Sequence, residues 1–161
     1  MAEFDPTTPE MRLFDEVDLA PAPQSTALQR VLNTWREQRA DQLLPSAISL
    51  QENVASALTP SIFMFSPNPD DQSFSLSRAG GKAIEIFGCK GSGVQLSEFS
   101  NRRVAVYARH LFNMVKKRRE AVCVRFTVRQ KGAASTTFEM LATPVAKGDG
   151  ADWIFGAVSA L

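Results

Sequence analysis

Few residues of this 161-residue chain could carry enzymatic chemistry. It contains two cysteines, Cys89 and Cys123, one histidine, His110, and no C-x-x-C pair. The usual nitrogen and sulfur ligand sets for zinc cannot be assembled from one chain of this composition. A hydrolytic triad would depend on His110 alone, and no glycine-rich phosphate loop, nucleophile elbow or zinc motif is present. The composition therefore argues against an enzyme and favours a binding or signalling protein.

The two thiols differ in their surroundings. Cys89 lies beside Lys90 in a glycine-rich stretch, where a lowered pKa would make the thiol redox sensitive; the alternative is an exposed, unreactive thiol. Cys123 lies in a strand-like apolar run and is expected to pack as a small apolar residue. Two cysteines are too few for a disulfide framework, so reduced thiols are expected.

The chain has no sequence signal for export or membrane insertion. Its first 18 residues are acidic and lack the cationic and apolar regions of a signal peptide. No apolar run approaches the roughly 18 residues of a membrane span. We therefore expect a cytoplasmic protein without a membrane partner.

Charge is unevenly distributed, although the formal net charge is only +1. Residues 1–20 carry six acids against one base, a net of −5, whereas residues 102–131 carry ten bases against one acid, a net of +9. The basic segment suits a nucleic acid or an acidic partner, a solvated cationic helix end, or a contact with the chain's own acidic segment. The candidate basic patch comprises Arg102, Arg103, Arg109, Lys116, Lys117, Arg118 and Arg119.

Three regions are predicted along the chain. Residues 1–24 hold four prolines among polar and acidic residues, which predicts a flexible acidic arm. Residues 25–60 are predicted to form a helix ending near Ala40, then a connector of turns or one brief helix. The apolar stripe of that helix belongs either to a dimer or partner seam or to the cover of a sheet; it comprises Leu28, Val31, Leu32 and Trp35.

Residues 61–161 are predicted to form the core. Residues 61–66 and 72–78 read as a strand hairpin, and a short helix follows at 82–88. A longer helix from Ser97 is expected to turn one apolar face inward. Three strands then cover 120–130, where apolar and other residues alternate, 135–145 and 153–160. This order predicts an α+β fold with a five-stranded antiparallel sheet of order 2-1-5-4-3, helices on one face and an N-terminal helical extension. The inward residues expected on the longer helix are Val104, Tyr107, Leu111, Met114 and Val115.

Several stretches carry a resemblance to a known family. They are Trp35-Arg36, LLPSAISLQ leading to SIFMF, SLSRAGGKAIEIFGCKGSGVQLSEF, and FEMLATPVAKGDG followed by WIFGAVSAL. Together, over about Gln24 to Leu161, they resemble the short single-domain PAS proteins of alphaproteobacteria. The resemblance implies the PAS fold in a stand-alone bacterial protein with a sensory or regulatory role rather than catalysis.

The resemblance also implies where a ligand would lie, between the inner sheet face and the short helices. Either a small organic ligand or packed side chains would fill this space. Haem would need a histidine on the longer helix, where His110 lies, and flavin a cysteine followed by Arg-Phe above the ring, which neither cysteine provides; no cofactor is therefore expected. The candidate pocket residues are Phe63, Phe65, Phe74, Leu76, Ile84, Phe87, Leu111, Phe126, Met140 and Phe155.

Three functions follow from these observations. The leading hypothesis is a signal-transduction module that works through contacts with other signalling proteins or as a homodimer. The second is a sensor with a small molecule in the interior. The third is nucleic-acid or acidic-partner binding through residues 102–131, which is disfavoured for nucleic acid because that segment lacks a helix-turn-helix partner and an aromatic platform.

Overall fold

The computed structural model describes residues 18–20, 22–39, 44–54, 56–68, 73–99, 102–129, 135–147 and 151–161. Residues 1–17 of the predicted acidic arm therefore lie outside the described residues. The elements are β1 (Asp18–Ala20), α2 (Thr26–Gln38), α3 (Ala47–Asn53), η1 (Ser56–Ser61), β2 (Ile62–Pro67), β3 (Phe74–Ala79), α4 (Gly81–Phe87), η2 (Leu96–Glu98), α5 (Arg102–Arg118), β4 (Val122–Arg129), β5 (Ser135–Lys147) and β6 (Ala151–Ala160).

One antiparallel sheet organises the molecule, in the order β1-β4-β5-β6-β2-β3. Without β1, this is the predicted order 2-1-5-4-3, which is confirmed. β1 was not expected from the sequence, because three residues are too few to display an alternating pattern. It pairs with β4 through Asp18 and Arg125, Leu19 and Val124, and Ala20 and Cys123.

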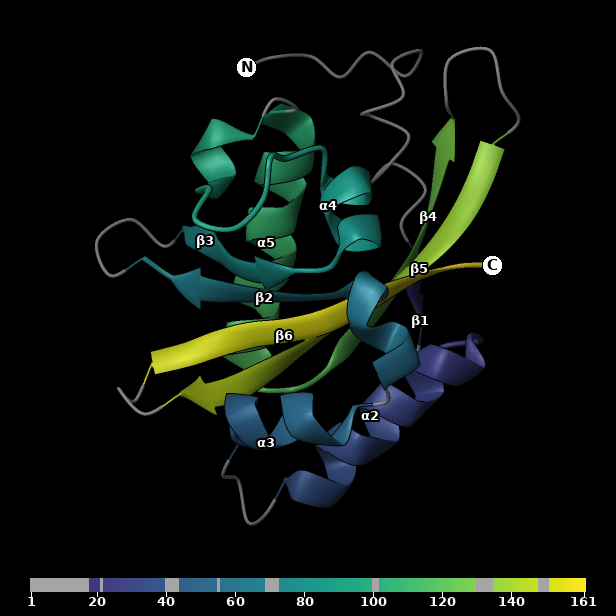
Figure 1. The fold of residues 1–161 in the computed structure, drawn as a ribbon, viewed down its shortest axis with the longest axis vertical. Coiled ribbons are helices and arrows are strands. Elements are labelled where there is room, and N and C mark those ends of the chain that lie inside the picture. The colour runs from purple at the N-terminus through teal and green to yellow at the C-terminus, as the bar shows by residue number, and fades with distance from the viewer. Residues whose placement is uncertain are drawn as a thin grey trace.

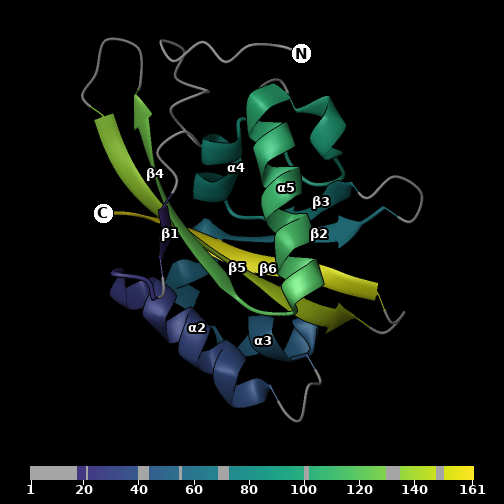
Figure 2. The same ribbon diagram turned by 180° about the vertical axis from the view of Figure 1, so that it is seen from behind.

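Helices cover both faces of the sheet (Figures 1 and 2). α4, η2 and α5 pack on one face around a core that includes Phe63, Phe87 and Phe112. α2 and α3 pack on the other face around a second core that includes Trp35, Leu141 and Phe155. The predicted N-terminal helical extension is thus a second layer of the domain, opposite the helices of the predicted core.

Local sequence accounts for the position of α2. Ser25 is its N-cap, and the Ser25 hydroxyl accepts a hydrogen bond from the Leu28 amide at 3.4 Å. At the other end, the Trp35 indole Nε1 donates to the carbonyl of Pro144 at 2.8 Å. The pairing of β4 with β5 runs only as far as Ala142, so the Pro144 carbonyl needs a partner other than β4. The indole supplies it, and this fixes α2 against β5.

Close approach of two strands explains one glycine. A Cβ placed on Gly156 of β6 would lie 2.2 Å from the carbonyl oxygen of Leu141 and 2.4 Å from the Phe63 ring. Both neighbours are held in the sheet, so only glycine fits between them. This contact lets the Phe63 ring lie directly under the central strand.

Candidate functional site

The interior between the sheet and α4, η2 and α5 holds eight of the ten predicted pocket residues. They belong to a single buried cluster: Phe63, Phe65, Phe74, Leu76, Phe87, Leu111, Phe126 and Met140. The prediction is wrong for Phe155, which lies in the core on the α2 side of the sheet. β6 is apolar on both faces, so its alternation did not define the orientation of Phe155. Ile84 is half-buried and outside the cluster, because Ala83 and Phe87, four residues apart, form the buried face of α4.

Aromatic rings pack against one another through this interior. The Phe63 centroid lies 5.2 Å from that of Phe87, and the Phe65 centroid lies 4.8 Å from that of Phe112. Phe112 also lies 5.4 Å from Phe74 with the rings nearly perpendicular, a favourable edge-to-face geometry. The rings therefore occupy the space in which the resemblance implied a ligand.

Phe112 was missed by the sequence analysis, although it is fully buried. The buried face of α5 is rotated from the predicted stripe. Of the predicted residues whose burial is described, Leu111 and Val115 are buried and Met114 is half-buried. The side chains of Val104 and Tyr107 lie outside the described set. The available signal was the spacing of Ala105 and Ala108, which lie three residues apart. Small residues at that spacing indicate the helix face that approaches a sheet closely. The buried face comprises Ala105, Ala108, Leu111, Phe112 and Val115.

The histidine considered as a haem ligand does not face the interior. His110 is exposed on α5, whereas its neighbours Leu111 and Phe112 are buried toward the sheet. His110 is therefore not placed to bind a haem within this interior. Among the residues that the structure describes, no group of three or more His, Cys, Asp or Glu side chains gathers to hold a metal.

The two thiols occupy different environments. Cys89 is half-buried and packs against the aromatic interior, and Cys123 is 5% exposed in the core beneath α2. Burial raises the pKa of Cys89 despite lowering by backbone hydrogen bonds at Gly91 and Cys89. The option of a lowered Cys89 pKa is therefore wrong. Burial, aided by the negative charge of Glu139, raises the pKa of Cys123 to about 12.

This difference predicts stepwise thiol labelling. At pH 8, Cys89 is expected to react slowly with a disulfide reagent, because little of it is thiolate, and Cys123 is expected to react only on unfolding. The absorbance of the released thiol, measured with and without denaturant, would report one and then two equivalents. Cys89→Ser should leave only the denaturant-dependent step. Rapid reaction of both thiols in the folded protein would contradict these pKa shifts.

The proposed partner stripe of the first helix is used inside the domain. Each side chain of the set is at most 5% exposed and packs on the sheet residues Cys123, Leu141 and Val145, among others. The stripe is the cover of the sheet, and the alternative of an exposed dimer seam is wrong for this fold. The set comprises Leu28, Val31, Leu32 and Trp35.

The predicted basic patch is divided among several contacts. Arg119 forms an ion pair with Asp152 at 2.9 Å, and the Lys116 amine lies 5.7 Å from the centroid of the Phe74 ring. Arg109, Lys117 and Arg118 are exposed. Arg102 and Arg103 lie in the first turn of α5, and their side chains are outside the described set. Two of the described cations are therefore engaged by contacts within the domain.

A buried carboxylate that the sequence did not point to joins α2 to the sheet. Glu139 is fully buried on β5 and accepts hydrogen bonds of 2.7 Å from the amides of Gln24 and Ser25. It also forms an ion pair with Arg125 of β4 at 2.9 Å. Burial alone would raise the pKa of Glu139, but these three donors and the charge of Arg125 lower it below its usual 4.5. The ionised carboxylate thus holds the N-terminal end of α2 in place.

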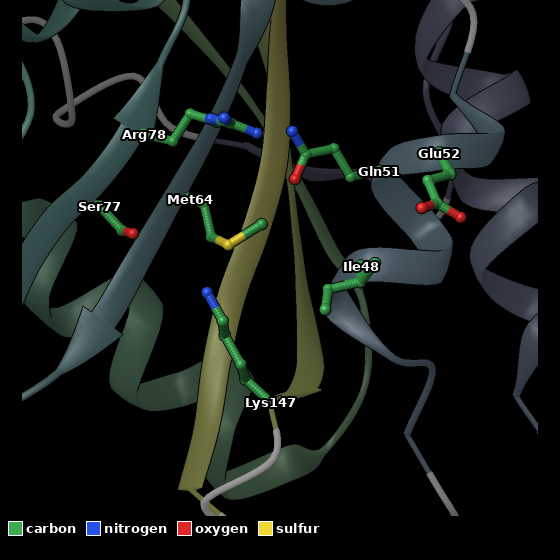
Figure 3. Close-up of a pocket in the computed structure, with 7 residues that line it drawn as sticks. All are labelled: Ile48, Gln51, Glu52, Met64, Ser77, Arg78 and Lys147. Atoms are coloured by element: carbon green, nitrogen blue, oxygen red, sulfur yellow. The ribbon is translucent and has the colours of Figure 1, made fainter.

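A groove of about 580 Å³ lies on the α3 side of the sheet, and we call it the α3 groove (Figure 3). Its floor is Met64 of β2, which is 5% exposed. α3 lines it with Ile48, Gln51 and Glu52, β3 with Ser77 and Arg78, and β5 with Lys147. In Figure 3, Arg78 and Gln51 reach toward one another beside Met64, while Lys147 points toward Met64 from the other end.

A second hollow of about 400 Å³ continues the α3 groove. It shares Gln51 and Arg78 with the first and extends to Ile62 and Gly80. Arg78 and Lys147 have no carboxylate partner among the described residues. The two hollows thus share part of their walls, and the first combines apolar Ile48 and Met64 with the two cations. The sequence analysis missed it, because its walls come from segments separated by up to about 100 residues.

Comparisons with known proteins identify the fold. The family model of the PAS domain matches residues 23–159. A structure of an RNA-binding light-oxygen-voltage receptor shares 14% identity over 71% of this chain, with a TM-score of 0.46. The PAS domain of BvgS from Bordetella pertussis shares 13% identity, also over 71% of this chain and over 85% of its own, with a TM-score of 0.48.

The matched lengths differ between these structures. The alignment spans 32% of the light-oxygen-voltage receptor chain. No curated protein matches the chain. Within the residues that the structure describes, no helix is long and apolar enough to cross a membrane.

Proposed function

Because the chain belongs to the PAS domain family, we propose that it is a non-catalytic sensory or regulatory module of cytoplasmic signal transduction that acts through protein contacts. PAS domains generally act in sensory signalling. We assign it protein contacts in place of an internal cofactor, because aromatic side chains fill the interior where a cofactor would lie.

The packed rings of the interior carry this proposal. Phe63, Phe65 and Phe112 are each at most 1% exposed and lie against one another between β2 and α5. A ligand in this space would have to displace rings that already bury their full surface, which amounts to about 1.5–3 kcal/mol for each side chain moved into water. A signal is therefore received and passed on at the surface of the domain.

Nucleic-acid binding has less support. Two bases of the 102–131 segment, Arg119 and Arg125, are engaged by Asp152 and Glu139. Of the other described cations, Arg109, Lys117 and Arg118 are exposed on one helix, and the one described cation–ring contact of that helix joins Lys116 to Phe74, which is buried in the core and so is not open to a base.

Two measurements on one preparation test the proposal. Protein purified natively from the source cytoplasm is expected to carry a protein partner or a second copy of itself in native mass spectrometry. Denaturing extraction of the same sample is expected to release no stoichiometric small molecule. A stoichiometric ligand, or a monomer without partners at high concentration, would contradict the proposal.

A further inference from the structure

The α3 groove combines features that suit an acidic, partly apolar peptide segment. Its floor is apolar Met64, and Ile48 at its rim is 60% exposed, among the most exposed large apolar side chains that the structure describes. Arg78 and Lys147 supply positive charge from two different strands. Glu52, which lies apart from them on α3, is the one acid of the lining (Figure 3).

The chain itself contains a segment of matching chemistry. Residues 1–17 carry five acids against one base, a net of −4, and apolar residues lie among the acids. Neither the aromatic interior nor the proposed function accounts for this composition. The acids are Glu3, Asp5, Glu10, Asp15 and Glu16, and the larger apolar residues are Met1, Phe4, Met11, Leu13, Phe14 and Val17.

The direction of β1 favours a second copy over the same chain as the source of this segment. β1 begins at Asp18 opposite Arg125 and runs toward Cys123, so its N-terminal end faces the end of β4 that carries Arg129. Arg125 pairs with Glu139, whereas Lys147 lies farther along β5 toward its other end, about 26 Å away at 3.3 Å per residue. α2 and α3 cover the sheet face between them (Figure 1). A segment of the same chain would have to pass around both helices, and a second copy meets no such obstacle.

We propose that the α3 groove binds residues 1–17 of a second copy of this chain. The segment's carboxylates pair with Arg78 and Lys147, and one of its apolar side chains covers Met64. Exchange of the two segments between two copies would give a closed, two-fold symmetric dimer. This inference rests on the proposed function, because it names the protein contact that the domain makes.

Charge reversal tests the groove. The full-length double variant Arg78→Glu/Lys147→Glu is expected to weaken dimerisation about tenfold or more in sedimentation velocity, because like charges would then face the acidic segment. The matched control is Lys117→Glu/Arg118→Glu, which reverses two exposed cations of α5 outside the groove and should dimerise as the unmodified chain does. Raising the salt concentration should weaken the unmodified dimer. A monomer at every concentration, or a dimer that the groove variant leaves unchanged, overturns the inference.

Cross-linking identifies the occupant. Isotope-labelled and unlabelled copies are mixed and treated with a carbodiimide, which joins a carboxylate to an amine with loss of water. Mass spectrometry is expected to find Lys147 of one copy joined to an acid of residues 1–17 of the other, and Lys147→Gln should remove that product. Links only within one chain, or links mainly to Lys116 and Lys117, overturn it.

These outcomes are separable from a failure of the proposed function. A groove-dependent dimer whose denaturing extract contains a stoichiometric small molecule would overturn the proposed function and keep the groove contact. A strict monomer that still captures another protein would keep the proposed function and overturn the groove contact.

Discussion

Replacement of Glu139 by alanine is expected to lower the free energy of unfolding by about 3–5 kcal/mol, the usual effect of removing one partner of a buried ion pair. The carboxylate is fully buried and binds the amides of Gln24 and Ser25 and the guanidinium of Arg125. Alanine leaves all three donors without their acceptor, and each part-buried donor that finds no other partner costs stability. α2 is expected to detach from the sheet first, because its N-terminal end loses its anchor.

Chemical denaturation at pH 7, followed by circular dichroism, measures this loss. Glu139→Gln keeps the shape of the side chain and one acceptor oxygen but removes the charge, so its effect should be intermediate. A loss below about 1 kcal/mol for the alanine variant would show that water replaces the carboxylate.

The pH dependence of stability follows from the same group. The pKa of Glu139 is lowered on folding, so its contribution is fully present above the unfolded value near 4.5 and is lost as pH falls through the lower folded pKa. Unfolding midpoints measured between pH 7 and pH 3 are therefore expected to fall more steeply for the unmodified protein than for Glu139→Gln. Parallel curves would contradict the assignment.

Replacement of Trp35 by alanine is expected to have an effect of similar size, about 3–5 kcal/mol. Trp35 is 1% exposed, and its indole both fills the space between α2 and β5 and donates to Pro144. The variant would leave a cavity under α2 and an unpaired carbonyl at the point where β4 no longer covers β5.

Trp35→Phe separates these two contributions. This variant keeps most of the apolar volume and removes the indole donor. It should therefore lower the free energy of unfolding by only about 1–3 kcal/mol. Thermal unfolding of both variants, followed in the far ultraviolet, measures the difference. Equal losses in the two variants would show that the hydrogen bond, rather than the volume, holds α2 in place.

The sheet was predictable from the sequence because each of its five longer strands has a local sequence signal. Alternation along residues 120–130 and the turns at Gly132 and Gly148 define the last three strands, and the first hairpin follows from an aromatic run beside Pro67. The order of these elements along the chain then suggested that the first hairpin pairs with the last strand, and the resemblance agreed with this. β1 carried no such signal, since its position depends on the edge that β4 offers.

Side-chain placement was predictable where one face of an element is polar, and not otherwise. Most interior residues were correctly grouped, but Phe155 was assigned to the wrong side because β6 is apolar on both faces. The stripe of α2 could serve a dimer or a sheet, and only the tertiary contacts decide between them. Glu139 and the α3 groove depend on residues far apart in sequence, which no local pattern relates.

The central place of β6 has a consequence for synthesis. β6 is the last strand in sequence, yet it lies between β5 and β2 and pairs with both. During translation, the β2–β3 hairpin and the β4–β5 pair are therefore made as two halves that cannot join until Trp153 to Ala160 has left the ribosome. Such long-range pairing makes closure slow relative to local contacts. Until then, the edges of β2 and β5 that pair with β6 are open, and a nascent-chain chaperone would be expected to cover them.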